Sequence, residues 1–592
     1  MKKFFLFLIL FLVFSCQIEP KHKKINELFK TDISLLIQEV SKLKDLVQSD
    51  ATLSQIQKGF LAAHQSYKQV EIISEYYFPA VSKAINGPAL PEFEEDDAKT
   101  VPPEGFQVIE EFIFPEYDKE SKNELLKEIG ILSANLKRLD KVSQTNELTD
   151  SHVFDAMRLE VFRIITLGIT GFDSPIAQNS VPEALSSIES IEKYYKVYAE
   201  NLDDITFKTV LKTIEYGKIY LKNHNDFNTF NRAFFITKIA NPLSASICKT
   251  QIALKIPVIK EMRGLRTTAQ TLFEENAFDA EAFSAFPDYE TTPEKIELGK
   301  LLFNDPILSS NNSRSCAFCH HPESAFTDGL EKAISFDGKS LVKRNTPTLS
   351  NIAFQRVFFL DSRVNYLEDQ ALAVIANKNE MHGSLKESVF KLSKNKIYVT
   401  RFKEAFPEKK IDEFAIKNAL ASYIRSLSHY DSKFDEYMRG NEIILNSDEK
   451  KGFNLFAGKA KCATCHFIPL TNGTVPPHFE KSESEVLGVP DKNKKLDTDL
   501  GKFELTKADI HRYSFKTPTI RNIDLTAPYM HNGVYKTLEE VIDFYNDAGG
   551  KGLGFKLSNQ TLPEDKLNLT NLEKKQLILF IKTLTDKKYS KN

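Results

Sequence analysis

The sequence contains no tryptophan among its 592 residues, and cysteine and methionine occur only six times each. No step of its chemistry therefore uses an indole side chain. Neither sign of charge dominates, since 78 Lys and Arg and 81 Asp and Glu leave a net charge of −3, which provides no basic field for nucleic acid. With 42% hydrophobic and 27% charged residues, the chain is neither intrinsically disordered nor a polytopic membrane protein. Its length predicts three or four domains.

The first 16 residues have the pattern of an export signal. Two lysines precede an apolar run from Phe4 to Phe14, which is too short to span a bilayer. The ending VFSC resembles a bacterial lipobox, although its phenylalanine is bulkier than the usual residue, and implies cleavage before Cys16 and lipid on its sulfur. We therefore expect a signal peptide at 1–15, a tether at 16–28 and a membrane-anchored lipoprotein of the periplasm. A plain signal peptide or an N-terminal anchor is the alternative.

Four of the six cysteines lie in two C-x-x-C-H motifs. The motifs are Cys316-Ala-Phe-Cys319-His320 and Cys462-Ala-Thr-Cys465-His466. This pattern is the attachment signal of a c-type haem, because two thiols on one helical turn add to its vinyl groups and the histidine binds the iron. A zinc site or a C-x-x-C redox pair does not explain a histidine after both pairs. We predict two covalent c-type haems, which leaves Cys248 as a buried thiol.

Similar elements flank the two motifs in the same order. GKLLF begins at Gly299 and GFNLF at Gly452, while TPTLSNI begins at Thr346 and TPTIRNI at Thr517. The repeat indicates two related cytochrome c-like domains near 275–435 and 440–590. Residues 29–265 have no haem motif and show helical periodicity, with Leu35 and Leu36 among the apolar positions. We predict an all-α protein in which an N-terminal helical bundle precedes two cytochrome c-like domains.

The region from about 275 to 590 resembles the bacterial dihaem cytochrome c peroxidase family, especially its MauG-like branch. Beyond the haem motifs, the resemblance rests on Arg344-Asn345-Thr346-Pro347-Thr348, Leu360-Asp361-Ser362-Arg363, Gln370, Glu380-Met381 and the run TAPYMHNG from Thr526. It implies two cytochrome c-like domains whose haems face an interface. It also implies an enzyme that reduces hydrogen peroxide with electrons from an external cytochrome c, quinol or similar donor, relayed by the second haem.

The resemblance assigns the peroxide chemistry to Gln370 and Glu380, which keep the family's spacing of ten residues. A carboxylate over the open face of the first haem can shuttle a proton between the peroxide oxygens, and an amide can orient the peroxide. An exposed place on a helix is the structural alternative. No histidine lies between His321 and Arg344, where members that need reductive activation carry a sixth ligand. We therefore expect a five-coordinate, high-spin first haem on His320.

For the second haem, held by His466, the resemblance implies Tyr545 as the distal ligand. Tyr545 lies fourteen residues after His531, where MauG-like members have tyrosine and typical members have methionine. A phenolate stabilises the higher oxidation states of iron. Met530 and His531 are the rival ligands, and a packed helix aromatic is the structural alternative for Tyr545.

Leu360 marks a departure from the family, whose members usually place a tryptophan there, between the haems. Leucine cannot relay an electron as a transient radical, so fast charge sharing between the haems is in doubt. The departure also argues against the oxidation of protein tryptophan that is known in the MauG branch. Phe358, Phe359 and Tyr366 are the aromatic candidates for the path, although phenylalanine is hard to oxidise.

The resemblance also implies a calcium ion between the haem domains. Its ligands carry over to the side chain of Asn345 and the carbonyl oxygens of Thr526 and Pro528. Oxygen ligands suit this hard cation. Ordinary loop residues are the alternative.

Residues from about 50 to 135 weakly resemble the imelysin group of exported helical proteins. The group's G-x-H-x-x-E motif corresponds to 105–110, where Gln107 replaces the histidine. A glutamine amide is a poor ligand for transition metals, which argues against metal binding and peptidase activity. His64, Glu71 and Glu110 are candidates for a residual polar site, and we expect a scaffold or partner-binding role for the bundle.

Two rival functions remain on the sequence alone. One is a MauG-like oxidase of a protein or small-molecule donor, and the other is a non-enzymatic electron-transfer or haem-sensor lipoprotein. Turnover of hydrogen peroxide separates the enzymes from the sensor. The family often forms homodimers, and the sequence leaves the oligomeric state and the electron donor open.

Overall fold

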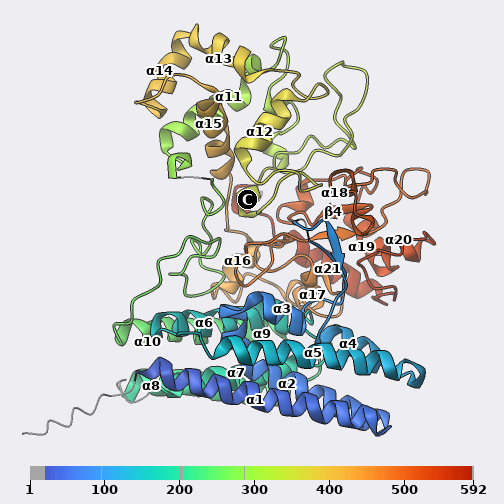
Figure 1. The fold of residues 1–592 in the computed structure, drawn as a ribbon. Coiled ribbons are helices and arrows are strands. Elements are labelled where there is room, and N and C mark those ends of the chain that lie inside the picture. The colour runs from blue at the N-terminus through green and yellow to red at the C-terminus, as the bar shows by residue number, and fades with distance from the viewer. Residues whose placement is uncertain (1–19, 95, 199–203, 286, 590–592) are drawn as a thin grey trace, which may run out of the picture.

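The computed structural model describes residues 20–94, 96–198, 204–285 and 287–589. The predicted signal peptide and Cys16 lie outside them. The described part is mostly helical, as predicted, and its strands form two two-stranded antiparallel sheets. In Figure 1 the long helices form the lower layer, the second haem-motif region lies above them, and the first is at the top. Over the described residues, no helix has both the length and the apolar character of a membrane span.

The N-terminal bundle is built from amphipathic helices. Its elements are α1 (Lys21–Gln48), α2 (Leu53–Tyr77), α3 (Pro79–Asn86), β1 (Glu92–Glu94), β2 (Lys99–Val101), α4 (Phe106–Ile113), α5 (Lys122–Ser143), α6 (Asp150–Arg163), α7 (Ser180–Lys196), α8 (Asp204–Asn223), α9 (Arg232–Phe235) and α10 (Asn241–Ala253). In α1, apolar residues from Ile25 to Val47 recur every three or four positions and are buried, as a core-facing helix requires. Leu35, which the periodicity included, is 49% exposed, because the neighbouring Leu36 takes the core-facing position.

The start of α1 corrects the predicted tether. Residues 21–28 are helical and Ile25 is fully buried in the bundle core. Burial of Ile25 and Phe29 on one face of the helix explains why the polar residues between them do not form a linker.

The two haem-motif regions contain different sets of elements and share one matched helix pair. The first contains α11 (Pro293–Asn304), α12 (Leu367–Ala376), α13 (Leu385–Ser393), α14 (Lys396–Ala405) and α15 (Glu413–Arg425). The second contains α16 (Lys433–Met438), α17 (Ser447–Phe456), β3 (Ser484–Val486), α18 (Phe503–Thr506), β4 (Ser514–Lys516), α19 (Leu538–Asn546), α20 (Gly549–Gly552) and α21 (Asn571–Lys582). In β3–β4, Ser484 pairs with Lys516.

The repeated glycines explain the matched helix crossings. α11 packs on α15 and α17 packs on α21. A Cβ atom at Gly299 would lie 1.9 Å from the carbonyl oxygen of Ala419, and one at Gly452 would lie 2.0 Å from that of Gln576. Only glycine permits backbones to approach so closely, so each helix pair is tied to the glycine of its repeat.

The two TPT-x-x-N-I segments meet at one buried carboxylate. Asn351 and Asn522 both have a φ of 61°, a left-handed conformation that asparagine tolerates. Both side-chain amides donate to Oδ2 of Asp586, at 3.1 and 2.7 Å. The internal repeat therefore joins the two regions at the C-terminal end of the second.

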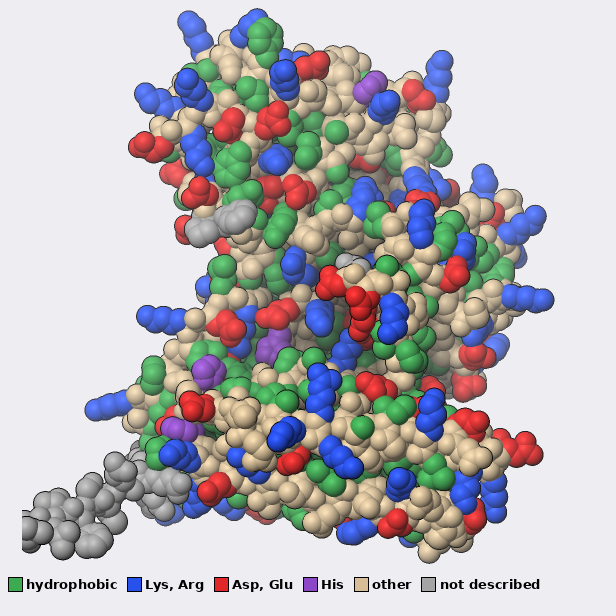
Figure 2. All heavy atoms as spheres, in the orientation of Figure 1, with side chains coloured by type: hydrophobic (Ala, Val, Ile, Leu, Met, Phe, Trp, Pro, Cys, Tyr) green, Lys and Arg blue, Asp and Glu red, His purple; other side chains and the backbone are tan. Residues whose placement is uncertain are grey.

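The hydrophobic cores divide the chain differently from the predicted domains. One apolar core runs from the bundle into the second region, whereas the first region has a core of its own. α16 belongs with the second region, because the ring of Phe434 lies 5.2 Å from that of Phe580. The predicted boundary near 435 therefore falls inside a helix. Lysines, arginines and acidic residues are interspersed over the face drawn in Figure 2, in keeping with the balanced net charge.

Candidate active site

The first C-x-x-C-H motif forms a compact turn that presents its histidine. Cys316–Phe318 is a 3-10 turn, and the backbone N–H of His320 donates to the carbonyl of Cys316 at 3.1 Å. Nδ1 of His320 donates to the carbonyl oxygen of Phe326 at 2.8 Å. This bond orients the ring and leaves Nε2 as the nitrogen for a metal. Burial lowers the pKa of His320, which favours the neutral imidazole that binds iron.

Glu380 lies within electrostatic reach of Cys316 and Cys319, in the loop that follows α12. Its Oε1 accepts a hydrogen bond from Nδ2 of Asn377 at 2.7 Å. Burial raises the pKa of Glu380, while Arg363, Asn377 and Arg314 lower it. The carboxyl group is thus half-buried near the first motif rather than exposed on a helix surface.

Gln370, on α12, is buried, and its Oε1 has no hydrogen-bond partner within the described residues. A buried amide oxygen without a partner is costly unless a ligand or water completes it. The amide oxygen of Gln370 is therefore available to a ligand or a water molecule.

Two other histidines of the first region, His321 and His382, contact groups of the protein. Nε2 of His321 lies 3.1 Å from the carbonyl oxygen of Phe318, and the ring of His382 lies edge-on against Phe336 at 5.6 Å. His321 is therefore engaged with its own turn.

The second motif has the same local design. Cys462–Thr464 forms a 3-10 turn, and Nδ1 of His466 lies 3.4 Å from the carbonyl oxygen of Thr471. Burial lowers the pKa of His466 to about 4, so the imidazole is neutral. No disulfide joins Cys248 or the four motif cysteines, the cysteines within the described residues. Burial raises the pKa of the Cys248 thiol to about 11.

A large cavity adjoins the second motif. Its volume is about 2030 Å³, and Cys462, Cys465, His466 and Tyr545 line it. Ligand pockets usually enclose about 300–1,000 Å³, so the space holds a group of haem size. Two free thiols and a neutral imidazole on its wall match the donor set of a c-type haem. The residues of both motifs fit the predicted cofactor.

Tyr545, on α19, lines this cavity together with His531, one of its rivals as the distal ligand. Burial raises the pKa of Tyr545, and the nearby Cys465 and Cys462 add to the rise. His531 has other partners, since its ring stacks on Phe515 at 4.0 Å and its Nε2 lies 3.4 Å from Oδ1 of Asp497. Met530 also lines the cavity.

The position of the family's tryptophan lies at the same cavity. Leu360 is on its lining, and its carbonyl oxygen accepts from the backbone N–H of Lys516 at 2.7 Å. The next residue, Asp361, accepts from Arg344 at 2.7 Å, and Arg344 in turn holds Asp499 at 2.7 Å. These ion pairs tie the first region to the second around Leu360.

The three predicted calcium ligands border the same large cavity. Asn345, Thr526 and Pro528 all line the cavity, and the backbone N–H of Asn345 donates to the carbonyl of His531 at 2.8 Å. The side-chain nitrogen of Asn345 donates to the carbonyl of Leu330 at 2.8 Å. The amide and carbonyl oxygens of this trio are of the type that calcium prefers.

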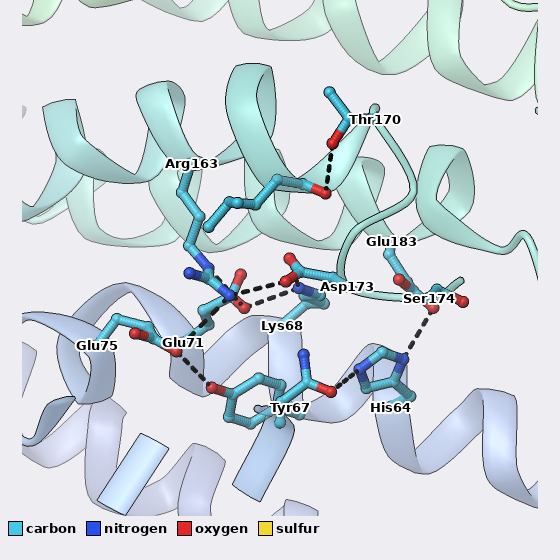
Figure 3. A network of polar contacts seen from close by, with 12 residues as sticks. His64, Tyr67, Lys68, Glu71, Glu75, Arg163, Thr170, Asp173, Ser174 and Glu183 are labelled. Carbon is cyan, nitrogen blue, oxygen red and sulfur yellow. Dashed lines mark hydrogen bonds and ion pairs between the residues drawn. The ribbon is translucent and has the colours of Figure 1, made fainter. Parts of the chain in front are cut away.

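In the bundle, His64 and Glu71 belong to a buried polar network (Figure 3), and Glu110 accepts a hydrogen bond from the hydroxyl of Ser174 at 3.1 Å. Nδ1 of His64 lies 2.9 Å from Oε1 of Glu183, and Oε1 of Glu71 accepts from Nζ of Lys68 at 2.7 Å. No group of three or more His, Cys, Asp or Glu side chains in the described segments has the arrangement of a metal site. Gln107 donates to the carbonyl of Asn86 at 3.2 Å and lies on the lining of the cavity of the second motif.

Sequence reasoning missed Arg314 and the loop 169–179. Arg314 donates to the carbonyl oxygens of Ile334 and Ser335 at 2.9 Å each and lies near Glu380. Its place two residues before Cys316 was the available signal. The loop lines the cavity of the second motif, but it is almost three hundred residues away in the sequence and no local pattern points to it.

Comparison with known proteins finds one family model and several similar proteins. A family model for di-haem cytochrome c peroxidase matches residues 293–443. The methylamine utilization protein MauG of Methylorubrum extorquens is 36% identical over 296 residues, which cover 50% of this chain and 78% of that protein. The cytochrome c551 peroxidase of Nitrosomonas europaea is 31% identical over 302 residues, which cover 50% and 83%. A solved MauG-like protein associated with microbial copper homeostasis is 31% identical, with a TM-score of 0.45 and coverage of 51% and 94%.

Proposed function

Because this chain belongs to the di-haem cytochrome c peroxidase family, we propose that it reduces hydrogen peroxide at its first haem site with electrons that an external donor delivers through the second. The observation that carries the proposal is Glu380 beside the first C-x-x-C pair, with the orphaned amide oxygen of Gln370 on the helix before it. A cytochrome c is the donor class suggested by the relatives' names, and a quinol is the alternative.

A c-type haem on His320 would supply an iron that binds the peroxide and exchanges electrons with it. Reduction of hydrogen peroxide to two waters needs two electrons and two protons. Asn377 holds one carboxyl oxygen of Glu380 and leaves the other to take a proton from one peroxide oxygen and return it to the leaving one. Gln370 orients the peroxide through its free amide oxygen.

The proposal is tested by adding peroxide to the oxidised protein. We expect a five-coordinate, high-spin spectrum for the first haem, because His321 is bonded within its own turn. One equivalent of peroxide is expected to change the spectrum without prior reduction, and reduced cytochrome c is expected to support steady turnover. Only six-coordinate low-spin iron, or fewer than two covalent haems, would overturn the assignment.

We further propose Tyr545 as the distal ligand of the second haem. Replacing Tyr545 with Phe removes the phenol oxygen but keeps the ring, so we expect a changed absorption and electron paramagnetic resonance spectrum for that haem alone. Tyr535→Phe is the matched control, since Tyr535 lies near Tyr545 and its ring packs on Phe544 at 5.5 Å, but it is not on the lining of the cavity. An unchanged spectrum in Tyr545→Phe excludes the ligand and favours His531 or Met530.

A second candidate is a MauG-like oxidase of a protein or small-molecule donor. Tyr545 on the wall of the second cavity supports it, because the MauG-like branch has tyrosine at this position. Peroxide consumption that requires a specific oxidisable substrate, and that cytochrome c cannot sustain, favours this function over the peroxidase.

The remaining assignments complete the proposal. The two haem-motif regions are cytochrome c-like domains, Asn345, Thr526 and Pro528 hold a calcium ion between them, and Cys16 carries a lipid that keeps the protein in the periplasm. The lipobox-like ending at Cys16 supports the last point, and the common cavity lining of the three oxygen donors supports the calcium site. The imelysin-like bundle acts as a scaffold.

A further inference from the structure

The loop 169–179 joins the bundle to the second haem site. It follows a π-helical turn, Ile164–Gly168, and ends where α7 begins. Together with Cys462, Cys465 and His466, its residues line the 2030 Å³ cavity, and they are Thr170, Gly171, Phe172, Ser174, Pro175, Ile176 and Gln178. A loop of the N-terminal bundle therefore forms part of the wall around the cysteines and histidine of another region.

Direct contacts hold the loop against the second motif. The ring of Phe172 meets that of Phe467 edge-on at 5.7 Å, and Phe467 directly follows His466. Nζ of Lys461, the residue before Cys462, donates to the carbonyl oxygen of Pro175 at 3.3 Å. The loop thus contacts the residue on each side of the C-x-x-C-H motif.

On the bundle side, buried charges fix the loop (Figure 3). Asp173 accepts from Nζ of Lys68 at 2.7 Å and from Nη2 of Arg163 at 2.9 Å. Oε1 of Glu110 accepts from the hydroxyl of Ser174 at 3.1 Å and from the N–H of Ala177 at 2.8 Å. Buried ion pairs are well suited to specify one geometry, because breaking one leaves an uncompensated charge.

Arg232 fastens the beginning of the loop to both regions. It is fully buried, and its Nε donates to the carbonyl oxygen of Ile169 at 2.7 Å. A Cβ atom at Gly458 would lie 2.5 Å from its Nη1, so the second region packs directly on the guanidinium. Nearby, the N–H of Ala233 donates to Oδ1 of Asn454 at 3.0 Å.

We propose that loop 169–179 is a wall of the second haem site, with Phe172 as the positioning residue that keeps water from the haem, and that the ionic network of the bundle holds this wall in place. The inference rests on the proposed function, because it concerns the haem on Cys462 and Cys465. It gives the bundle a role in setting the redox properties of that haem.

The physical consequence concerns the reduction potential of the second haem. With the phenolate of Tyr545 on its iron, as proposed above, the oxidised haem would be neutral at the metal and the reduced haem would carry one negative charge, so a water-poor wall disfavours the reduced form. Opening the wall admits water and stabilises the reduced form. The potential of the second haem, but not that of the first, should therefore rise when Phe172 loses its ring.

The experiment is a spectroelectrochemical titration of the dihaem protein and its Phe172→Ala, Phe172→Leu and Phe207→Ala variants. In Phe172→Ala we expect the ratio of reduced to oxidised second haem, at a fixed applied potential, to rise about tenfold, an upward shift of ~59 mV for a one-electron couple. Phe172→Leu, which keeps an apolar side chain, restores most of the potential. Phe207→Ala removes a ring packed on Tyr195 in the same bundle and leaves both haems unchanged.

The outcomes separate the inference from the function on which it rests. An unchanged second potential in Phe172→Ala, or an equal shift of both haems, overturns the inference alone. An equal shift in Phe207→Ala does the same, because it shows a general loosening of the bundle. Protein without a haem on Cys462 and Cys465 overturns the proposed function and the inference with it. If Phe172→Ala does not fold, the potentials of the second haem in Phe172→Leu and in the polar variant Phe172→Gln are compared instead. The inference requires Phe172→Gln to shift that potential more than Phe172→Leu does.

Discussion

Replacing Glu380 by glutamine is expected to slow peroxide turnover by about 10²- to 10⁴-fold, the usual contribution of a positioned general acid or base. Glutamine keeps the size of the side chain and can still accept from Asn377, but it cannot take up and return a proton. Both haems should remain attached, because Glu380 forms no hydrogen bond with the histidine ligand or with the cysteine sulfurs. Steady-state kinetics and pyridine haemochrome spectra measure the two quantities.

Glu387→Gln is the matched control for this prediction. Glu387 is an exposed carboxylate on α13, seven residues further along the same region, and its loss should leave turnover within about twofold of the parent, since exposed substitutions away from a site have small effects. If Glu380→Gln retains full turnover, the proton passes through another group and the assignment is wrong.

Replacing Asp435 by alanine is expected to lower the free energy of unfolding of the holoprotein by about 3–5 kcal/mol. Asp435 and Arg521 are 0% and 1% exposed and share two hydrogen bonds of 2.8 Å. Asp435 also accepts from the backbone N–H and hydroxyl of Ser432, the cap of α16. The substitution removes the bidentate partner of a buried guanidinium and the Asp435 half of the capping box at the start of α16. Urea unfolding followed by haem absorbance measures the loss.

Two further variants interpret this result. Glu404→Ala breaks an exposed pair with Arg401, in which both side chains are about half exposed, and is expected to cost less than about 1 kcal/mol. The double variant Asp435→Leu with Arg521→Met removes both charges and should recover part of the stability. Equal losses for Asp435→Ala and Glu404→Ala would contradict the role of the buried pair.

Local sequence patterns were sufficient for the chemistry that lies within one turn or one repeat. Each C-x-x-C-H motif forms a single turn, because its five residues place thiols and imidazole through short-range geometry. Gly299 and Gly452 were recognised from the sequence as parts of the repeat, and the structure places them at two helix crossings, where only glycine lets the backbones approach so closely. The pair Gln370 and Glu380 came from the family resemblance and stays a prediction, with both residues on α12 and the short loop behind it.

The boundaries of the tether and of the domains were less predictable from the sequence, because the burial of apolar side chains decides where they fall. Polar residues at 21–28 read as a tether, yet Ile25 and Phe29 supply an apolar face that the bundle covers. The domain boundary near 435 failed for the same reason, since Phe434 and Asp435 find their partners in Phe580 and Arg521, more than eighty residues away.

The sequence by itself determined that this protein has two haem attachment turns, an internal repeat around them and a family with a peroxide chemistry. Only the tertiary structure decided that the bundle forms a wall of the second haem cavity and that Asp586 joins the two repeats. The reason is that attachment depends on side chains a few residues apart. A cavity wall and a shared carboxylate instead depend on residues that are far apart in the sequence. Phe172 and Phe467 are an example, since they meet only after the chain has buried its apolar faces.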